Sequence, residues 1–172
     1  WCPNVIDTRS SVPLSHYYPG GYYVDWLCID GYNWGTNPAR PDRWKTFADV
    51  FGLTYSVLTQ ISSRPIMIAE TGSSEIGGSK AAWIADTFEV ALPNRFPRIR
   101  ALIWFNWNAD HMDWIIESSP DAQAAFAKGI ASPYYRAGEF GAIISAEDPV
   151  LTPEVVACPE DHCVYLPAIA AD

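Results

Sequence analysis

The chain has 172 residues, of which 49% are hydrophobic and 18% are charged, so it can bury a core and does not have the composition of a disordered segment. Eleven Lys and Arg residues stand against twenty Asp and Glu residues, which gives a formal net charge of −9. This charge repels a phosphate backbone, and no apolar run approaches the roughly 18 residues that cross a membrane. Composition therefore indicates neither a nucleic-acid partner nor a membrane span.

Aromatic residues make up 14% of the chain, with 8 Trp and 9 Tyr among them. Sugar-binding proteins use such rings because the apolar C–H face of a pyranose packs against them. Large aromatic side chains also fill ordinary protein cores. Composition alone favours the core explanation.

The chain reads as strand–loop–helix cycles that follow one another. Residues 23–30 predict a buried strand, and a Pro-rich stretch then leads into a helix. Residues 66–69 predict a second buried strand, followed by a loop at 70–78 and a helix over 80–92 with Ser79 as its N-cap. The apolar stripe of the first helix consists of Trp44, Phe47, Phe51, Tyr55 and Leu58.

A third cycle begins with a strand at 100–105, and its helix has Ser119 as N-cap and Pro120 at the first helical position. Strands that alternate with helices in this way predict a parallel sheet or barrel. A closed (β/α)8 barrel needs about 250 residues, so we expect most of the barrel to lie upstream of a truncated start. We expect a barrel domain over 1–135 and an irregular tail or linker over 136–172.

The candidate functional residues follow from the position of the strand ends. In a parallel α/β barrel, functional groups gather where the strands end. This rule selects Asp30 and Tyr32, then Glu70, then residues 104–108.

Glu70 ends an apolar strand, where an unpaired buried charge is costly. Alternation along the strand places Ile66, Ile68 and Glu70 on one side. If both isoleucines face the barrel interior, Glu70 rises from that interior at the rim. The alternative is a solvated carboxylate, or one paired with Arg64 or Lys80.

Other kinds of site lack their motifs. The segment 72–80 lies between a strand and a helix but has no Gly-Lys-Ser/Thr sequence, so it does not predict a phosphate loop. His16, His111 and His162 are scattered without metal-ligand spacing, and no GxSxG motif is present. We expect no metal and no cofactor.

The four cysteines allow two kinds of role. Cys158 and Cys163 lie in a short polar loop that a disulfide could close, and a pair of free thiols there is an equal alternative. Cys2 and Cys28 lie in apolar, strand-like contexts and are expected to be buried thiols. The ending VYLPAI at 164–169 resembles short C-terminal tails of some secreted bacterial proteins, so we expect a secreted, bacterial-type protein.

Three motifs together resemble glycoside hydrolase family 26. They are YYPGGYYVDWLCIDGYNWG at 17–35, PIMIAETGS at 65–73 and ALIWFN at 101–106, in the order and at the spacing of that family. The opening WCPN at 1–4 is similar to the end of that family's fifth strand. The resemblance covers residues 1–135.

This resemblance implies the last three strand–helix units of a (β/α)8 TIM barrel that hydrolyses β-1,4-mannan by double displacement with retention of configuration. Glu70 takes the place of the nucleophile, and Tyr32 matches the tyrosine that hydrogen-bonds it. Trp104 matches the tryptophan beneath the sugar that is cleaved, and Trp107 and Trp34 are candidates for neighbouring subsites. The implied partner is a polysaccharide.

The resemblance also implies a missing group. A retaining glycosidase needs a second carboxyl group about 5–5.5 Å from the nucleophile, and the family carries it on the fourth strand, upstream of this chain. Neither Glu75 nor Asp30 is assigned that role, so we expect the chain alone to be inactive. Another β-glycanase, acting on xylan or mixed-linkage glucan, and a non-catalytic carbohydrate-binding scaffold are the alternatives.

Overall fold

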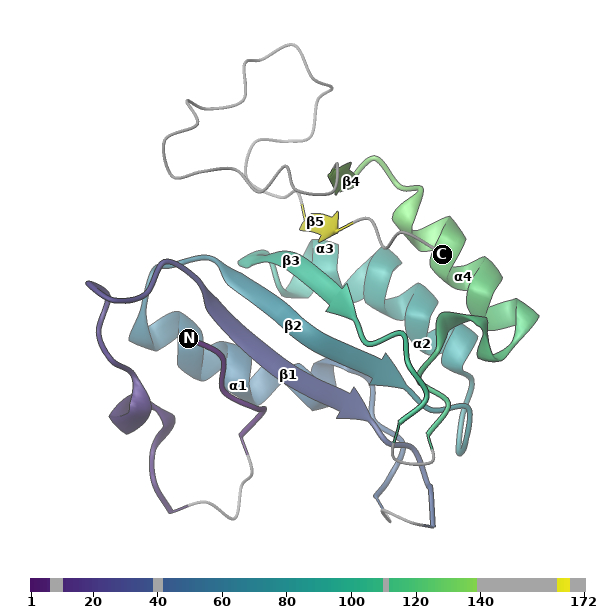
Figure 1. The fold of residues 1–172 in the computed structure, drawn as a ribbon, viewed down its shortest axis with the longest axis horizontal. Coiled ribbons are helices and arrows are strands. Elements are labelled where there is room, and N and C mark those ends of the chain that lie inside the picture. Colours follow the sequence, from purple (N-terminus) through teal and green to yellow (C-terminus); the bar gives the residue numbers. More distant parts are fainter. Residues whose placement is uncertain (7–10, 39–41, 110–111, 139–163, 168–172) are drawn as a thin grey trace.

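The computed structural model describes residues 1–6, 11–38, 42–109, 112–138 and 164–167. Within them lies one parallel sheet with helices packed on one of its faces (Figure 1). The strands are β1 Leu27–Asn33, β2 Ile66–Ser73, β3 Ile99–Trp104, β4 Tyr135–Gly138 and β5 Val164–Pro167, in the order β1-β2-β3-β5-β4. The longer helices are α1 Phe47–Ile61, α2 Lys80–Asp86 and α4 Pro120–Ile130.

Shorter helical pieces complete the described fold. A π-helical turn, Thr87–Ala91, joins α2 to α3 Leu92–Arg95, so the chain is helical from residue 80 to residue 95, close to the predicted helix. Short 3₁₀ turns lie at Leu14–Tyr17 and Ile116–Ser118. No described helix is long and apolar enough to cross a membrane.

Local hydrogen bonds set where the helices begin. The predicted N-caps are confirmed, because Ser79 Oγ accepts from Ala82 N–H and Ser119 Oγ accepts from Ala122 N–H. At the start of α1, Thr46 and Asp49 form a reciprocal capping box.

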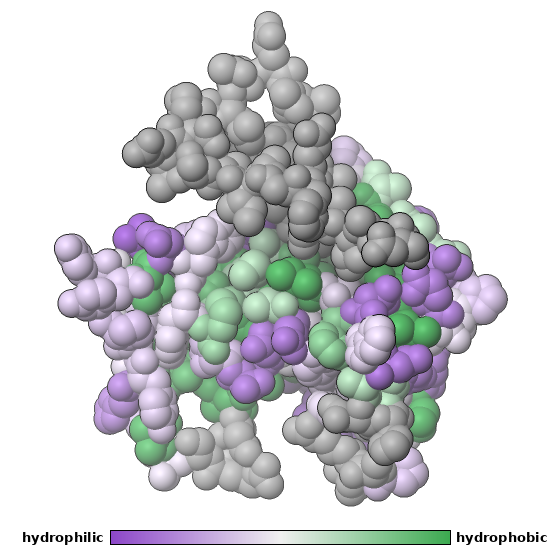
Figure 2. Space-filling model, viewed as in Figure 1, coloured by the Kyte–Doolittle hydropathy of each residue, from purple (hydrophilic) through white to green (hydrophobic). Residues whose placement is uncertain are grey.

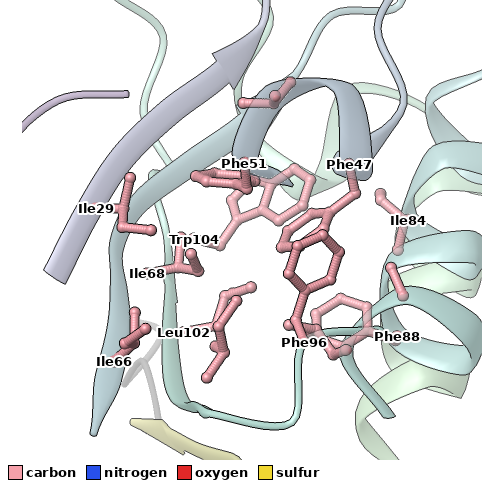
Figure 3. Close-up of a cluster of buried hydrophobic side chains, with 14 of the residues drawn as sticks. Ile29, Phe47, Phe51, Ile66, Ile68, Ile84, Phe88, Phe96, Leu102 and Trp104 are labelled. Carbon is pink, nitrogen blue, oxygen red and sulfur yellow. The ribbon is translucent and has the colours of Figure 1, made fainter. Parts of the chain in front are cut away.

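The core lies between the sheet and the helices. In Figure 3, side chains from the three long strands point toward a cluster of aromatic and aliphatic side chains of the helical layer. The strand residues in this cluster are Ile29, Ile66, Ile68, Leu102 and Trp104, and the residues of the helical layer are Phe47, Phe51, Ile84, Phe88 and Phe96.

Strand β2 continues through residues that were predicted to form a loop. The polar stretch from Glu70 to Ser73 pairs with β1 from Asp30 to Asn33. Asn33 Nδ2 donates to Ser73 Oγ over 2.9 Å, and both side chains are fully buried. Polar residues that resemble a loop in the sequence are therefore paired inside the sheet.

The first five residues run beside the free edge of β1. Cys28 N–H donates to Trp1 O, and Val5 N–H donates to Asp30 O, both over 2.9 Å. This pairing brings the Cα atoms of Cys2 and Cys28 to 4.4 Å, and the two form a disulfide. The prediction of buried thiols was wrong, because pairing with a distant segment decided their state.

The fold class is confirmed in part. Three parallel strands alternate with helices, as predicted, and the described residues form an open sheet. Two short strands lie beyond β3: β4, which begins at the last residue of the predicted domain, and β5, within the segment predicted as a tail. Cys158 and Cys163 lie outside the described residues.

The disulfide gives a first prediction. Replacing Cys28 by Ser should lower the stability of the domain by about 3–4 kcal/mol, because the bond closes a loop of 26 residues. Thermal unfolding of the complete protein measures this loss. A digest prepared without reductant should also contain a peptide pair joined through Cys2 and Cys28, and finding both as free thiols would contradict the assignment.

Candidate active site

A β-bulge in β2 determines the direction of Glu70. Ile29 pairs with Ile68, but the next residue of β1, Asp30, pairs with Glu70, so Ala69 is an extra residue in β2. Residues in register on neighbouring strands share a face, and Glu70 therefore points the same way as Asp30.

That face is the one opposite the helices. Gly31 points toward α1, since a Cβ built there would come within 2.9 Å of Val50 and Phe51. Its neighbours Asp30 and Tyr32 must then point away from α1. We call this side of the sheet the open face; it is the side seen in Figure 1.

The alternation predicted for β2 was therefore wrong. Ile66 and Ile68 are fully buried against the helices, whereas Glu70 is exposed on the open face. The extra residue at Ala69 turns the side chain of Glu70 to the opposite face of the sheet from Ile66 and Ile68. An apolar strand can thereby present a carboxylate to solvent.

Tyr32 and Glu70 contact each other directly. Tyr32 Oη donates a hydrogen bond of 2.6 Å to Glu70 Oε2. A hydrogen bond to a charged carboxylate is short and strong. The two residues selected from the sequence thus form one unit at the ends of neighbouring strands.

Asp30 lies beside this pair. Burial raises the pKa of the Asp30 carboxyl, the charge of Glu70 raises it further, and a hydrogen bond from the Glu70 main-chain N–H partly offsets both. One oxygen, Oδ1, is buried without a hydrogen-bond partner among the described residues. Two carboxyl groups thus occupy adjacent positions, one exposed and one partly buried.

Aromatic rings surround Tyr32. Its ring centroid is 4.8 Å from that of Trp114, and 6.0 Å from those of both Trp34 and Phe105. Trp34 is half-buried, and Trp107, on the segment after β3, is 70% exposed. Trp34 therefore belongs to the surroundings of Tyr32, and Trp107 presents an exposed ring.

Trp104 does not lie where it was expected. Its side chain is 3% exposed and shares the helix-facing side of β3 with Leu102 (Figure 3). It packs against Trp83 of α2 and Phe126 of α4. The indole N–H donates to Trp114 O over 2.7 Å. Trp104 is thus a core residue here, and a sugar on the open face would not reach it.

Trp114 is the residue that the sequence analysis missed. It is 1% exposed and packs beside Tyr32, and a Cβ at Gly72 would come to 3.0 Å from its ring. The segment from 106 to 115 has no periodicity that would select it. The available signal was the residue type of Trp114, because it is a large aromatic residue in the segment that follows a predicted strand.

The suggested charge partners of Glu70 are engaged elsewhere. Lys80 Nζ donates to the carbonyl oxygens of Asp113 and Ile115, and the Arg64 guanidinium donates to Gly21 O. Glu70 is therefore held by Tyr32, and the residue is exposed to solvent.

Seen in the orientation of Figure 1, the middle of the open face carries hydrophobic and hydrophilic residues side by side (Figure 2). The part of the chain that the structure describes contains no cluster of three or more His, Cys, Asp or Glu side chains that could hold a metal ion.

The chain is similar in sequence to a known protein. No family model matches the chain. Over 131 residues the chain is 42% identical to Endoglucanase H of Acetivibrio thermocellus, a match that covers 76% of this chain and 14% of that protein. The chain is thus a homologue of a glycoside hydrolase, and it spans a small part of that relative's length.

Proposed function

We propose that this chain provides the nucleophile of a retaining glycoside hydrolase and that Glu70 is that nucleophile. The observation that carries the proposal is the exposed Glu70 carboxylate at the end of a parallel strand, held by Tyr32, whose own ring packs among Trp34 and Trp114. Homology to an endoglucanase supports the same class of reaction.

The chemistry follows from which Glu70 oxygen accepts the Tyr32 hydrogen bond. Tyr32 engages Oε2, so Oε1 of Glu70 can attack the anomeric carbon of the sugar. The bond from that carbon to the leaving oxygen breaks, an ester bond to Glu70 forms, and an acid protonates the leaving oxygen. Water then cleaves the ester and gives its proton to the same group, now acting as base.

The acid/base belongs to another part of the complete protein. Asp30 lies in register beside Glu70 and is partly buried, so it does not reach across a bound sugar to the leaving oxygen. We propose that Asp30 instead helps to hold the bulge in β2. The three motifs favour glycoside hydrolase family 26 and a (β/α)8 barrel in which β1 to β3 are the last three strands.

Two substrate classes are supported by different observations. The name of the relative favours a β-glucan, and the resemblance of the motifs favours β-1,4-mannan. We place β-glucan first, because sequence identity over 131 residues is the more extensive comparison. Either polymer presents the flat apolar faces that rings such as Trp34 and Trp107 can stack against.

We also propose that the protein is secreted. The Cys2–Cys28 disulfide is the supporting observation, since such bonds persist in oxidising compartments.

Removing the nucleophile tests the proposed function. In the complete enzyme, Glu70→Ala should lower kcat by about a thousandfold or more, because no ester intermediate can form. Release of reducing ends from mixed-linkage glucan, mannan and xylan measures both this loss and the substrate. Glu89→Gln, an exposed carboxylate on the helical layer, is the matched control. Wild-type turnover by Glu70→Ala would refute the nucleophile assignment.

Tyr32→Phe removes one hydroxyl from the site. We expect kcat to fall about 10- to 100-fold with little change in KM, because a hydrogen bond to a charged group is lost. Steady-state kinetics of the complete enzyme measure kcat and KM separately. Wild-type kcat in Tyr32→Phe would show that the bond does not act on the nucleophile.

Asp30→Asn tests the neighbouring carboxyl through pH. A raised pKa means that ionised Asp30 is less favourable in the folded state than in the unfolded state. Its unfavourable contribution is absent below the ordinary carboxyl pKa of about 3.9 and develops as pH rises through the raised value. The variant should therefore gain thermal stability relative to wild type between acidic and neutral pH, as measured by calorimetry. A difference that does not vary with pH would argue against this.

A further inference from the structure

Three consecutive main-chain carbonyl groups after β3 are each held by a side-chain donor. Lys80 Nζ donates to Asp113 O over 2.5 Å and to Ile115 O over 2.7 Å. Trp104 Nε1 donates to the carbonyl between them, that of Trp114, over 2.7 Å. We call residues 113–115 and these donors the loop clamp.

Lys80 is the central donor of the loop clamp. It is 0% exposed at the first position of α2, and its third hydrogen bond, of 2.9 Å, goes to Ser118 Oγ. An ammonium has three N–H donors, so all of them are used. Burial lowers the pKa of the Lys80 ammonium, and the nearby charges of Asp113, Glu75 and Glu117 oppose this shift.

Glu75 ties the preceding loop to the same segment. Its carboxylate accepts hydrogen bonds from Ser118 Oγ and Ser119 Oγ, and its main-chain N–H donates to Asp113 Oδ2. The loop after β2 and the loop after β3 are therefore joined through side chains on both sides of Trp114.

Trp114 connects the loop clamp to the candidate nucleophile. Its ring packs 4.8 Å from that of Tyr32 and 5.0 Å from that of Trp34. Gly72 lets the ring approach β2 closely. A shift of Trp114 would therefore change the wall against which Tyr32 rests, and with it the direction of the hydroxyl that reaches Glu70.

We propose that Lys80 is a positioning residue for catalysis: by holding the carbonyl groups on either side of Trp114, it fixes this ring against Tyr32 and thereby aligns Glu70. The inference rests on the proposed function. Lys80 itself contacts no sugar, because its side chain is fully buried and its ammonium group lies 5.9 Å from the centre of the buried Trp104 ring.

Lys80→Met in the complete enzyme is the first test, because methionine is similar in length and cannot donate. We expect kcat to fall about 10-fold or more with KM within about threefold of wild type, which is the same division between kcat and KM as in Tyr32→Phe. Lys128→Met, which changes an exposed lysine of α4, is the matched control and should keep wild-type kinetics.

A double-mutant cycle separates positioning from general destabilisation. If Lys80 acts through Tyr32, the Lys80→Met/Tyr32→Phe enzyme should have the kcat of Tyr32→Phe alone, within about twofold. If the losses in kcat of the two single variants multiply in the double variant, the inference is overturned. A Lys80→Met enzyme that loses thermal stability but keeps wild-type kcat would overturn it as well.

The remaining outcomes are also decisive. Should Lys80→Met fail to fold, Trp114→Phe enters the same cycle with Tyr32→Phe, and additivity there overturns the proposed route through Trp114. Wild-type turnover in Glu70→Ala would overturn the proposed function itself. Loss of activity in Glu70→Ala with unchanged Lys80→Met would overturn the positioning role alone.

Discussion

The extra residue at Ala69 is the constraint on which the site depends. Before it, β2 directs Ile66 and Ile68 into the core; after it, Glu70 stands beside Asp30 on the open face. A regular strand would have placed Glu70 among the buried aromatic rings of the helical layer, where an unpaired charge is costly. The bulge therefore lets one strand serve both the core and the candidate active site.

The two faces of the sheet also explain why Trp104 and Trp114 lie in different environments. Trp104 lies on the core side of β3 and contributes its N–H to a carbonyl, while Trp114 packs beside Tyr32 next to Glu70. Each supports the other, because the Trp104 donor helps to hold the main chain that carries Trp114. Composition alone favoured a core role for the aromatic residues. In the structure they are divided between the core and the surroundings of the Glu70 carboxylate.

The edge of the sheet beside β1 is organised by a different kind of bond. Main-chain pairing places residues 1–5 alongside β1, and the Cys2–Cys28 disulfide fastens that segment two residues before Asp30. Val5 N–H donates to the carbonyl of Asp30 itself. The strand that carries Asp30 and Tyr32 is thus bounded by β2 on one side and by a covalently attached segment on the other.

Local features could be predicted from the sequence, because they depend on residues within one helical turn or one strand. Ser79 and Ser119 cap helices by accepting from N–H groups three residues away, and Glu70 follows an apolar strand that can be recognised directly. Tyr32 could be paired with Glu70 only through a family resemblance. That assignment used more than local pattern.

Only the tertiary structure decided the facing of Glu70, the partner of Cys28 and the roles of Trp114 and Lys80. Each depends on pairing between segments far apart in the chain, such as Asp30 with Glu70 or Lys80 with residues 113–115. Side-chain alternation assumes an uninterrupted strand, and a single bulge reverses it. The sequence by itself identified the carboxylate, whereas strand register decided which face of the sheet it serves.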